Sequence, residues 1–211
     1  MPARVVTVAQ QKGGAGKTTL VAQLGAALAG DGHHVAVVDI DPQASLTGWM
    51  RVREHRGAGV PSLRFSMIGG WRLGVEIDRL KREADLVLVD SPPHAETDAR
   101  MAIRAADLVL VPVQPSPLDI WASKATLELA KKERSRALIV LNRVPPRGHS
   151  VEDALAAIAE LGAGSLAARL GNRQAFITSM ARGLGVVESE PRSTAAGEVR
   201  ELADEVMQKL A

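Results

Sequence analysis

The chain has 211 residues, of which 46% are hydrophobic, and a formal net charge of +2. This length and apolar content exclude a disordered chain, and we expect one domain over residues 1–211. Because the chain has no cysteine, disulfides, thiolate metal sites and iron–sulfur clusters are excluded, and a reducing cytoplasm is the expected setting. A soluble protein is expected, since no signal-peptide pattern opens the chain and no apolar run reaches the ~20 residues that cross a bilayer.

A glycine-rich stretch between a predicted strand at 5–9 and an alanine-rich predicted helix indicates a phosphate-binding loop. It consists of Lys12, Gly13, Gly14, Ala15, Gly16, Lys17, Thr18 and Thr19. Successive backbone N–H groups of such a turn, together with the positive end of the helix dipole, attract an anion. Lys17 is expected to reach the outer phosphates and the Thr18 hydroxyl to hold magnesium. The alternative is an ordinary glycine turn with Lys12 solvated.

The loop departs from the plain P-loop pattern, because Gln11 occupies the position of the first glycine. With its second lysine at Lys12, it resembles the deviant Walker A loop of the ParA/MinD family of P-loop ATPases. The resemblance implies binding of ATP and Mg²⁺. It also implies that Lys12 reaches across an ATP-sandwiched homodimer to the partner's nucleotide, where its charge stabilises the transition state of phosphoryl transfer.

Aspartates end two predicted interior strands, at 34–39 and 86–90. The segment D-I-D-P-Q, from Asp39, is similar to the family's switch I, and D-S-P-P, from Asp90, is similar to its switch II. The resemblance assigns Asp41 to the attacking water and Asp39 and Asp90 to magnesium, through its water shell. For each aspartate taken alone, the alternative is a carboxylate that caps a nearby helix.

The segment around residues 44–70 carries weaker patterns. We expect a short helix at 44–49 capped by Gln43 or Ser45, then an exposed, mobile connection over 51–70 with a short strand at 63–67. Helices are expected at about 71–83 and 96–106, and an interior strand at 108–113.

The segment from Gln114 to Asp119 is similar to the family's P-S-P-x-D motif and precedes a long predicted helix at 118–134. The next strand, 137–141, ends in Asn142 and Arg143. The resemblance places this pair at the nucleotide, with Asn142 on the adenine edge. An asparagine at a strand end is otherwise a turn former, and that reading stays open.

In the C-terminal third, the pattern of apolar residues predicts two further helices, at 150–161 and 198–210. Ser150 is expected to cap a helix at 150–161 whose apolar face contains Val151, Leu155, Ile158 and Leu161. Residues 173–199 resemble the end of the small partition-type ParA proteins, and the apolar side of 198–210 is read as a core face. Strands that alternate with helices along the chain predict an α/β fold of P-loop NTPase type, with a twisted, mostly parallel sheet covered by helices on both faces.

Two segments are rich in cations, with eight against three anions between Arg51 and Arg82 and seven against two between Lys124 and Arg147. Such clusters bind phosphate backbones or form solvated helix faces, and the sequence leaves both open. For the DNA-contacting surface, the resemblance favours a pool in the C-terminal part. It contains Arg169, Arg173, Arg182, Arg192 and Arg200.

The resemblance implies a slow ATPase, stimulated by DNA and a partner, that acts as a switch. ATP favours a homodimer that binds nucleoid DNA non-specifically, and a ParB-like or other adaptor links it to a plasmid, chromosome, chemoreceptor cluster or carboxysome. A MinD-like membrane switch is an alternative, although residues 198–210 carry four acids against two bases, which anionic lipid would repel. A metabolic P-loop enzyme is a second alternative. Of these possibilities the resemblance favours the DNA-bound switch, so we expect a nucleoid-associated protein with no membrane partner.

Overall fold

The computed structural model describes residues 3–56, 59–93 and 96–211. Its strands are β1 (Arg4–Val8), β2 (Val35–Asp39), β3 (Arg64–Met67), β4 (Leu86–Asp90), β5 (Leu108–Val113), β6 (Ala137–Leu141) and β7 (Gly164–Ser165). They form one sheet in the order β3-β2-β4-β1-β5-β6-β7, and every pairing between these strands is parallel. Strands β4 and β5 are continuous apolar runs up to their last residues, because both faces of the sheet are covered.

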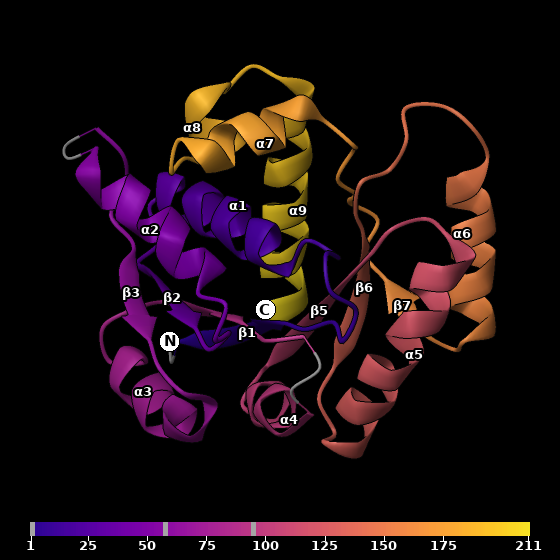
Figure 1. Cartoon of the computed structure of the whole chain (residues 1–211), viewed down its shortest axis with the longest axis horizontal. Helices are drawn as coiled ribbons and strands as arrows, with labels where there is room; N and C mark the ends of the chain where they lie inside the picture. Colours follow the sequence, from indigo (N-terminus) through magenta and orange to yellow (C-terminus); the bar gives the residue numbers. More distant parts are fainter. Residues whose placement is uncertain (1–2, 57–58, 94–95) are drawn as a thin grey trace.

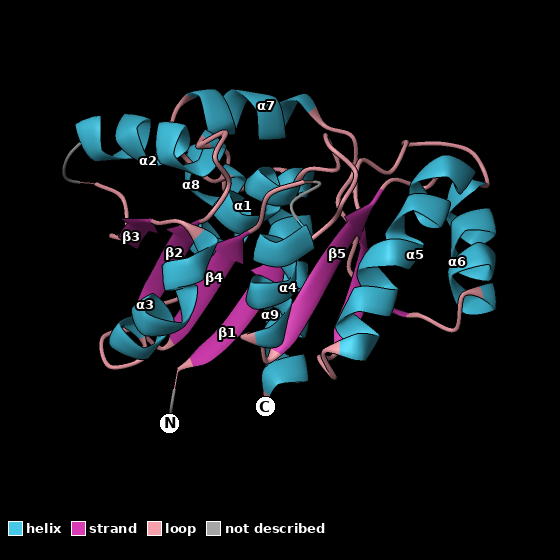
Figure 2. Ribbon diagram, turned by 60° about the horizontal axis from the view of Figure 1, so that its bottom comes forward, coloured by secondary structure: helices cyan, strands magenta, loops and turns pink. Residues whose placement is uncertain are grey.

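Helices cover the sheet on both sides (Figures 1 and 2). They are α1 (Lys17–Gly30), α2 (Ser45–His55), α3 (Leu73–Leu80), α4 (Glu96–Arg104), α5 (Pro117–Lys132), α6 (Ser150–Glu160), α7 (Gln174–Ala181), α8 (Val186–Ser189) and α9 (Thr194–Leu210). Helices α1 and α9 pack on one face, and α3, α4, α5 and α6 pack on the other. The expected α/β fold with a twisted parallel sheet is confirmed.

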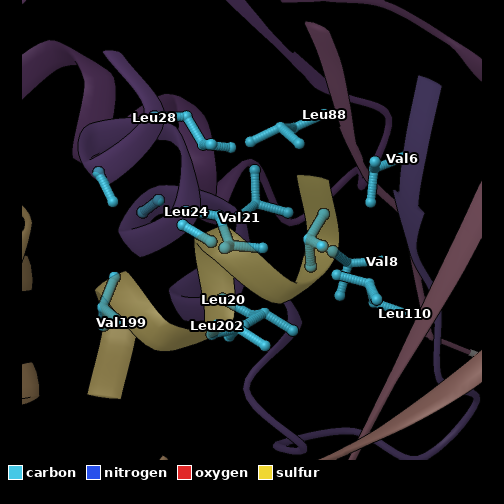
Figure 3. Packing of buried hydrophobic residues seen from close by; sticks show 14 of the residues in the cluster. Val6, Val8, Leu20, Val21, Leu24, Leu28, Leu88, Leu110, Val199 and Leu202 are labelled. Carbon is cyan, nitrogen blue, oxygen red and sulfur yellow. The ribbon is translucent and has the colours of Figure 1, made fainter. Parts of the chain in front are cut away.

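Alternate residues of each strand point to opposite sides of the sheet, and this sorts the core into layers. Val6 and Val8 lie with Leu20 and Leu24 of α1 and with Leu202 of α9 (Figure 3). The intervening strand residues, such as Val5, Val87 and Val89, pack with α3 and α4 instead.

The register of the central strands brings three strand ends together. Val8 of β1 and Asp39 of β2 are both aligned with Asp90 of β4. Because the strands are parallel, the loops that follow them leave the same edge of the sheet. This edge carries the candidate site.

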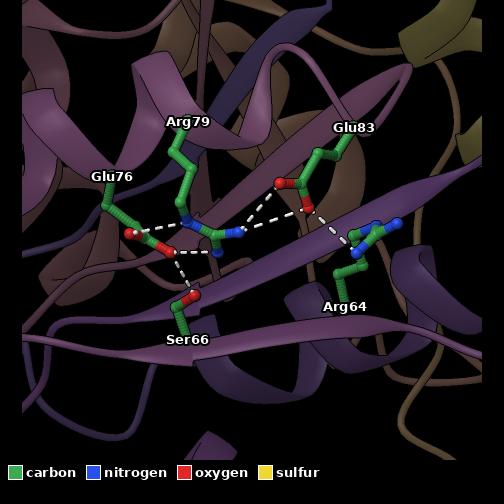
Figure 4. Close-up of polar contacts among 5 residues, drawn as sticks. All are labelled: Arg64, Ser66, Glu76, Arg79 and Glu83. Atoms are coloured by element: carbon green, nitrogen blue, oxygen red, sulfur yellow. Dashed lines mark hydrogen bonds and ion pairs between the residues drawn. The ribbon is translucent and has the colours of Figure 1, made fainter.

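The edge strand β3 is joined to α3 by a polar network (Figure 4). Arg79 donates to Glu76 at 2.6 Å and to Glu83 at 3.2 Å, and Glu83 in turn pairs with Arg64 of β3 at 2.9 Å. The Ser66 hydroxyl also donates to Glu76. These contacts hold α3 over a strand that is exposed along its outer side.

The expected mobile connection over 51–70 is wrong at its start. Helix α2 continues to His55, and Arg53 is only 4% exposed, because its guanidinium pairs with Glu188. The short strand is present as β3, whereas residues 57 and 58 lie outside the described residues. The helix expected at 71–83 is a 3₁₀ turn over Gly70–Arg72 followed by α3, which ends at Leu80.

Two expected helix caps are also wrong. Helix α2 begins after Ala44, which has a φ of 54° and no side-chain cap, and neither Gln43 nor Ser45 caps it. Helix α6 has His149 as its N-cap, so Ser150 lies inside the first turn and its buried hydroxyl lacks a partner. On the same helix Ala154 and Ile158 are buried while Leu155 is exposed, because the packed side is rotated from the expected one.

The apolar side of the C-terminal helix faces the core, as expected. Val199, Leu202, Ala203, Val206 and Leu210 of α9 are all buried. A search of the described residues finds no helix whose length and hydropathy would let it span a bilayer.

Candidate nucleotide-binding site

The glycine-rich loop joins the end of β1 to the start of α1. Gly14 has a φ of 75° and Gly16, the N-cap of α1, a φ of 94°, a region that side chains other than glycine rarely adopt. A Cβ atom at Gly16 would also collide with the side-chain amide of Asn142. The loop therefore needs glycine at position 16 for its conformation and for its packing.

Lys17 and Thr18 open helix α1 beneath the loop. Lys17 is buried, and burial lowers the pKa of its ammonium group, while the charges of Asp90 and Asp41 oppose that shift. Lys17, Thr18 and Asp41 line one cavity of about 320 Å³ together with Gly14 and Gly16. A cation, a hydroxyl and a carboxylate thus converge on one pocket beside the glycine-rich loop.

Asp90 lies fully buried at the end of β4. The Thr18 hydroxyl donates to its Oδ2 at 2.7 Å, and its Oδ1 is buried without a hydrogen-bond partner among the residues that the structure describes. Burial raises the pKa of this carboxyl to about 7; the Thr18 hydrogen bond lowers it, and the charge of Asp39 raises it further. A buried carboxylate oxygen without a donor beside a hydroxyl is a fitting environment for a hard cation such as Mg²⁺.

Asp39 and Asp41 follow β2 at the same edge. Asp39 is buried and accepts hydrogen bonds from the Asp41 N–H at 3.0 Å, the Thr47 N–H at 2.9 Å and the Thr47 hydroxyl at 2.7 Å. Asp39 therefore caps the first turn of α2, which is the helix-capping alternative that the sequence left open for each aspartate. Asp41 accepts from the Gln43 N–H at 2.9 Å and is one of the residues that line the cavity.

Lys12 lies outside that cavity. Its Nζ donates to Asp119 Oδ2 at 2.8 Å, and the same oxygen accepts from the Ser116 hydroxyl at 2.7 Å. Asp119 is buried in the first turn of α5, whereas Lys12 is partly exposed. The sequence marked Asp119 only as part of a motif, so its contact with Lys12 was missed.

A second cavity, of about 630 Å³, adjoins the first and shares Gly16, Thr19, Arg143 and Met180 with it. Asn142 and Phe176 also line it. Phe176 and Met180 come from α7 and were missed, because nothing in their local sequence indicates a ligand.

Asn142 braces the loop. Its Nδ2 donates to the Ala15 carbonyl at 2.9 Å, and its Oδ1 accepts from the Arg143 N–H at 2.9 Å. The amide retains one N–H donor and one acceptor lone pair, which leaves it able to contact a ligand as well. Arg143 has a φ of 53°, so the chain turns sharply after β6.

The arginines considered for DNA contact differ in their surroundings. Arg173 forms an ion pair with Glu198, with 2.6 Å between Nη2 and Oε1. Arg169, Arg182, Arg192 and Arg200 are exposed, and none of them forms an ion pair with another described residue.

Proteins of known role resemble the chain along most of its length. It is 30% identical over 210 residues to Maintenance of carboxysome distribution protein A of Halothiobacillus neapolitanus, covering 96% of this chain and 95% of the relative. It is 30% identical to the chromosome-partitioning ATPase Soj of Thermus thermophilus, covering 98% and 96%, and 32% identical to the protein ParA of Rhizobium radiobacter, covering 82% and 80%.

Solved structures share the fold. The ATP complex of a Cyanothece McdA variant superposes with a TM-score of 0.80 at 18% identity, covering 99% of this chain and 96% of that one. The cell division ATPase MinD of Pyrococcus furiosus gives a TM-score of 0.78 at 23% identity, covering 99% and 100%. A family model described as CobQ/CobB/MinD/ParA nucleotide binding domain matches residues 6–186. The resemblance to ParA/MinD ATPases is confirmed, and the chain belongs to the CobQ/CobB/MinD/ParA nucleotide-binding family.

Proposed function

We propose that this chain is a ParA-like ATPase that dimerises around ATP and Mg²⁺, binds DNA non-specifically and positions a cargo over the nucleoid. One observation carries the proposal: Lys17, Thr18 and Asp41 line one cavity at the glycine-rich loop, while Lys12 is held outside it by Asp119. A loop with two lysines, only one of which faces its own cavity, fits an ATPase completed by a second subunit.

The phosphates of ATP would lie in the loop, between its backbone N–H groups and the ammonium group of Lys17. Thr18 and Asp90 would hold Mg²⁺, with Asp39 in reach through water, and the ion would neutralise charge on the phosphate oxygens. Asp41 would orient a water molecule that attacks the γ-phosphorus. The bond from that phosphorus to the bridging oxygen then breaks and leaves ADP and inorganic phosphate.

The base of the nucleotide would occupy the larger cavity. Asn142 and Arg143 stand at its polar side, and Phe176 and Met180 supply apolar contacts. A flat apolar ring with polar edges is well matched by such a lining. Specificity for adenine would then depend on the remaining donor and acceptor of Asn142.

DNA binding and cargo choice belong to the proposal as well. The named relatives distribute carboxysomes or partition chromosomes, which supports movement of a protein or DNA cargo through an adaptor. A chain with a net charge of +2 attracts DNA weakly, and a dimer doubles its contact surface. ATP-dependent dimerisation would therefore switch DNA binding on, and hydrolysis would switch it off.

The Lys12→Ala variant tests the central step. We expect ATP hydrolysis to fall at least about a hundredfold, while nucleotide binding by the monomer is largely kept, because the missing charge acts on the partner's phosphates. Phosphate release and binding of a fluorescent ATP analogue measure the two effects. Lys124→Ala is the matched control, since Lys124 is an exposed lysine of α5 with only a 4.0 Å contact to Glu128.

Full turnover in the Lys12→Ala variant would contradict the proposal. The class of the protein is tested separately, by measuring ATPase activity with non-specific duplex DNA and a candidate adaptor. Stimulation by these partners is expected. Hydrolysis that instead required a small carboxylic substrate would indicate a metabolic enzyme.

A further inference from the structure

A buried glutamine lies one turn beyond the residues of α1 that line the larger cavity. Thr19 and Leu20 line that cavity, and Gln23 follows them by four and three residues, so it lies on the same side of the helix. Gln23 is fully buried. A buried amide is costly unless its polar atoms are hydrogen-bonded, so its partners show which parts of the fold it holds together.

Both polar atoms of this amide contact residues far away in the chain. The Nε2 of Gln23 donates to the Ser179 hydroxyl of α7 at 3.1 Å, and its Oε1 accepts from the Val186 N–H at the start of α8 at 2.7 Å. The Ser179 hydroxyl donates in turn to the Phe176 carbonyl at 3.0 Å, within α7. Gln23 is therefore a polar bridge from the helix that follows the glycine-rich loop to both α7 and α8.

Helix α7 forms an apolar wall of the larger cavity. Phe176, Ile177 and Met180 line this cavity, and Met180 also lines the smaller one beside the glycine-rich loop. Ser179 comes three residues after Phe176 and directly before Met180, and it is fully buried against α1. The distance between Ser179 and α1 therefore decides where the wall lies relative to the loop.

Helix α7 has few other contacts that fix this distance. With eight residues it is too short to be stable by itself, and Phe176 and Met180 border an open volume of about 630 Å³ on one side. The turn after α7 is held to α2, because Arg53 donates to the Gly183 carbonyl at 3.2 Å. Within the described part of the chain, the side-chain hydrogen bond that joins α7 to α1 is the one between Gln23 and Ser179.

We propose that Gln23 is a positioning residue for the base of the nucleotide, on which it acts through Ser179 and the wall formed by Phe176 and Met180. The inference rests on the proposed function, in which the base occupies the larger cavity. Gln23 sets how far the apolar wall lies from the part of α1 that lines the cavity. Without its amide, the wall is free to move away and the base loses apolar contact.

The phosphate side of the site does not depend on this bridge. Lys17 and Thr18 lie in the first turn of α1, and the Thr18 hydroxyl is held by Asp90 of β4. Loss of the Gln23 amide therefore weakens contacts to the base and leaves contacts to the phosphates. A residue that only stabilised the fold would not separate these two parts of the ligand.

Steady-state ATP hydrolysis by the Gln23→Met variant tests this role. Methionine keeps the length of the side chain and removes both polar atoms. We expect KM for ATP to rise at least about fivefold while kcat changes by less than about twofold, because the lost contact is made by the bound base and not by the reacting phosphates. Inorganic triphosphate with Mg²⁺, which carries no base, should inhibit the variant and the natural sequence with the same inhibition constant.

Ser179→Ala is a milder second variant, because it leaves the hydrogen bond between Gln23 and Val186 in place. It should raise KM about two- to threefold, and adding it to Gln23→Met should cause little further change, since both substitutions break the same bridge. Ser135→Ala is the matched control. The Ser135 hydroxyl also donates to a backbone carbonyl, that of Ile103 at 2.8 Å, but it precedes β6 at the opposite edge of the sheet, so KM should not change.

The outcomes separate the two proposals. If the natural sequence neither binds nor hydrolyses ATP, the proposed function fails. If it hydrolyses ATP but Gln23→Met keeps its KM, or if KM and the inhibition constant of triphosphate rise by the same factor, only the present inference is overturned. A lower Tm with an unchanged KM would show a purely structural residue and would equally overturn it. Should Gln23→Met fail to fold, Ser179→Ala and its control decide by the same two constants.

Discussion

At the scale of single residues, the ionised carboxylate of Asp90 lowers the free energy of unfolding. It is fully buried, one of its oxygens has no donor within the described part of the chain, and its pKa is raised to about 7. The unfolded chain releases this proton near pH 4, so between about pH 4 and 7 the folded state binds more protons than the unfolded state. The free energy of unfolding therefore falls as pH rises through this window, by roughly 4 kcal/mol in total.

The Asp90→Asn variant should raise the free energy of unfolding at pH 8 without Mg²⁺, because the amide keeps an acceptor for Thr18 and carries no buried charge. The gain should shrink at pH 5, where Asp90 of the natural sequence is protonated. Urea unfolding at the two pH values measures both. An equal gain at pH 5 and 8 would show that ionisation is not the cause.

The same variant should lose the added stability that ATP and Mg²⁺ give to the natural sequence, since an amide is a poor magnesium ligand. Thermal unfolding with and without ATP and Mg²⁺ measures this loss. A nucleotide-dependent rise in Tm that matches the natural sequence would argue against a metal-binding role for Asp90.

At the scale of elements, helix α2 connects the Asp39–Gln43 segment to the α7–α8 region. Its first turn is capped by Asp39, and its third and last turn is anchored by Arg53. The Arg53 guanidinium donates to Glu188 at 2.6 Å and to the Pro61 carbonyl at 2.7 Å, and it lies 5.2 Å from the Trp49 ring centre. A buried ion pair thus anchors the end of α2 that lies away from the Asp39–Gln43 segment.

Replacement of Arg53 by methionine should lower the free energy of unfolding by about 3–5 kcal/mol, because it leaves the Glu188 carboxylate buried and unpaired. Combining it with Glu188→Met should restore part of the loss. Urea unfolding measures both effects. Arg51→Met, on the exposed side of the same helix, is the control and should change stability by less than about 0.5 kcal/mol.

For the whole molecule, the small net charge bears on the proposed binding of DNA. The net charge of the chain is only +2, so its overall attraction to DNA is weak. In the proposed function, DNA binding would depend on adding the surfaces of two subunits, and each phosphate contact would make it more sensitive to salt. Nucleotide state and ionic strength should therefore control the same equilibrium.

Binding of non-specific duplex DNA should require ATP and weaken as salt rises. Arg182→Ala should weaken it uniformly across DNA sequences and lower the salt slope by about 1, whereas Arg173→Ala should have a smaller effect because its guanidinium is already paired with Glu198. Fluorescence anisotropy over a salt series measures both. Equal losses from the two variants would contradict this ranking.

Local patterns determined much of this protein. The strands Leu86–Asp90, Leu108–Val113 and Ala137–Leu141 have the predicted bounds, because continuous apolar runs between polar ends are typical of interior parallel strands. The sequence likewise predicted the glycine-rich loop, the aspartates at strand ends and the buried side of α9. Each of these features depends on the spacing of residues that lie close together in the chain. The roles assigned to the individual site residues remain predictions.

Tertiary structure alone decided the contacts between residues far apart in the chain. Lys12 meets Asp119 across 107 positions, Arg53 meets Glu188 across 135, and Phe176 reaches the larger cavity from a helix with no sign of a ligand. Such partners are selected by shape and by the need to pair buried charge, and neither leaves a periodic trace in the sequence. The extension of α2 to His55 was not predicted for the same reason. Its last turn is stabilised by the ion pair between Arg53 and Glu188, which lies near the other end of the chain.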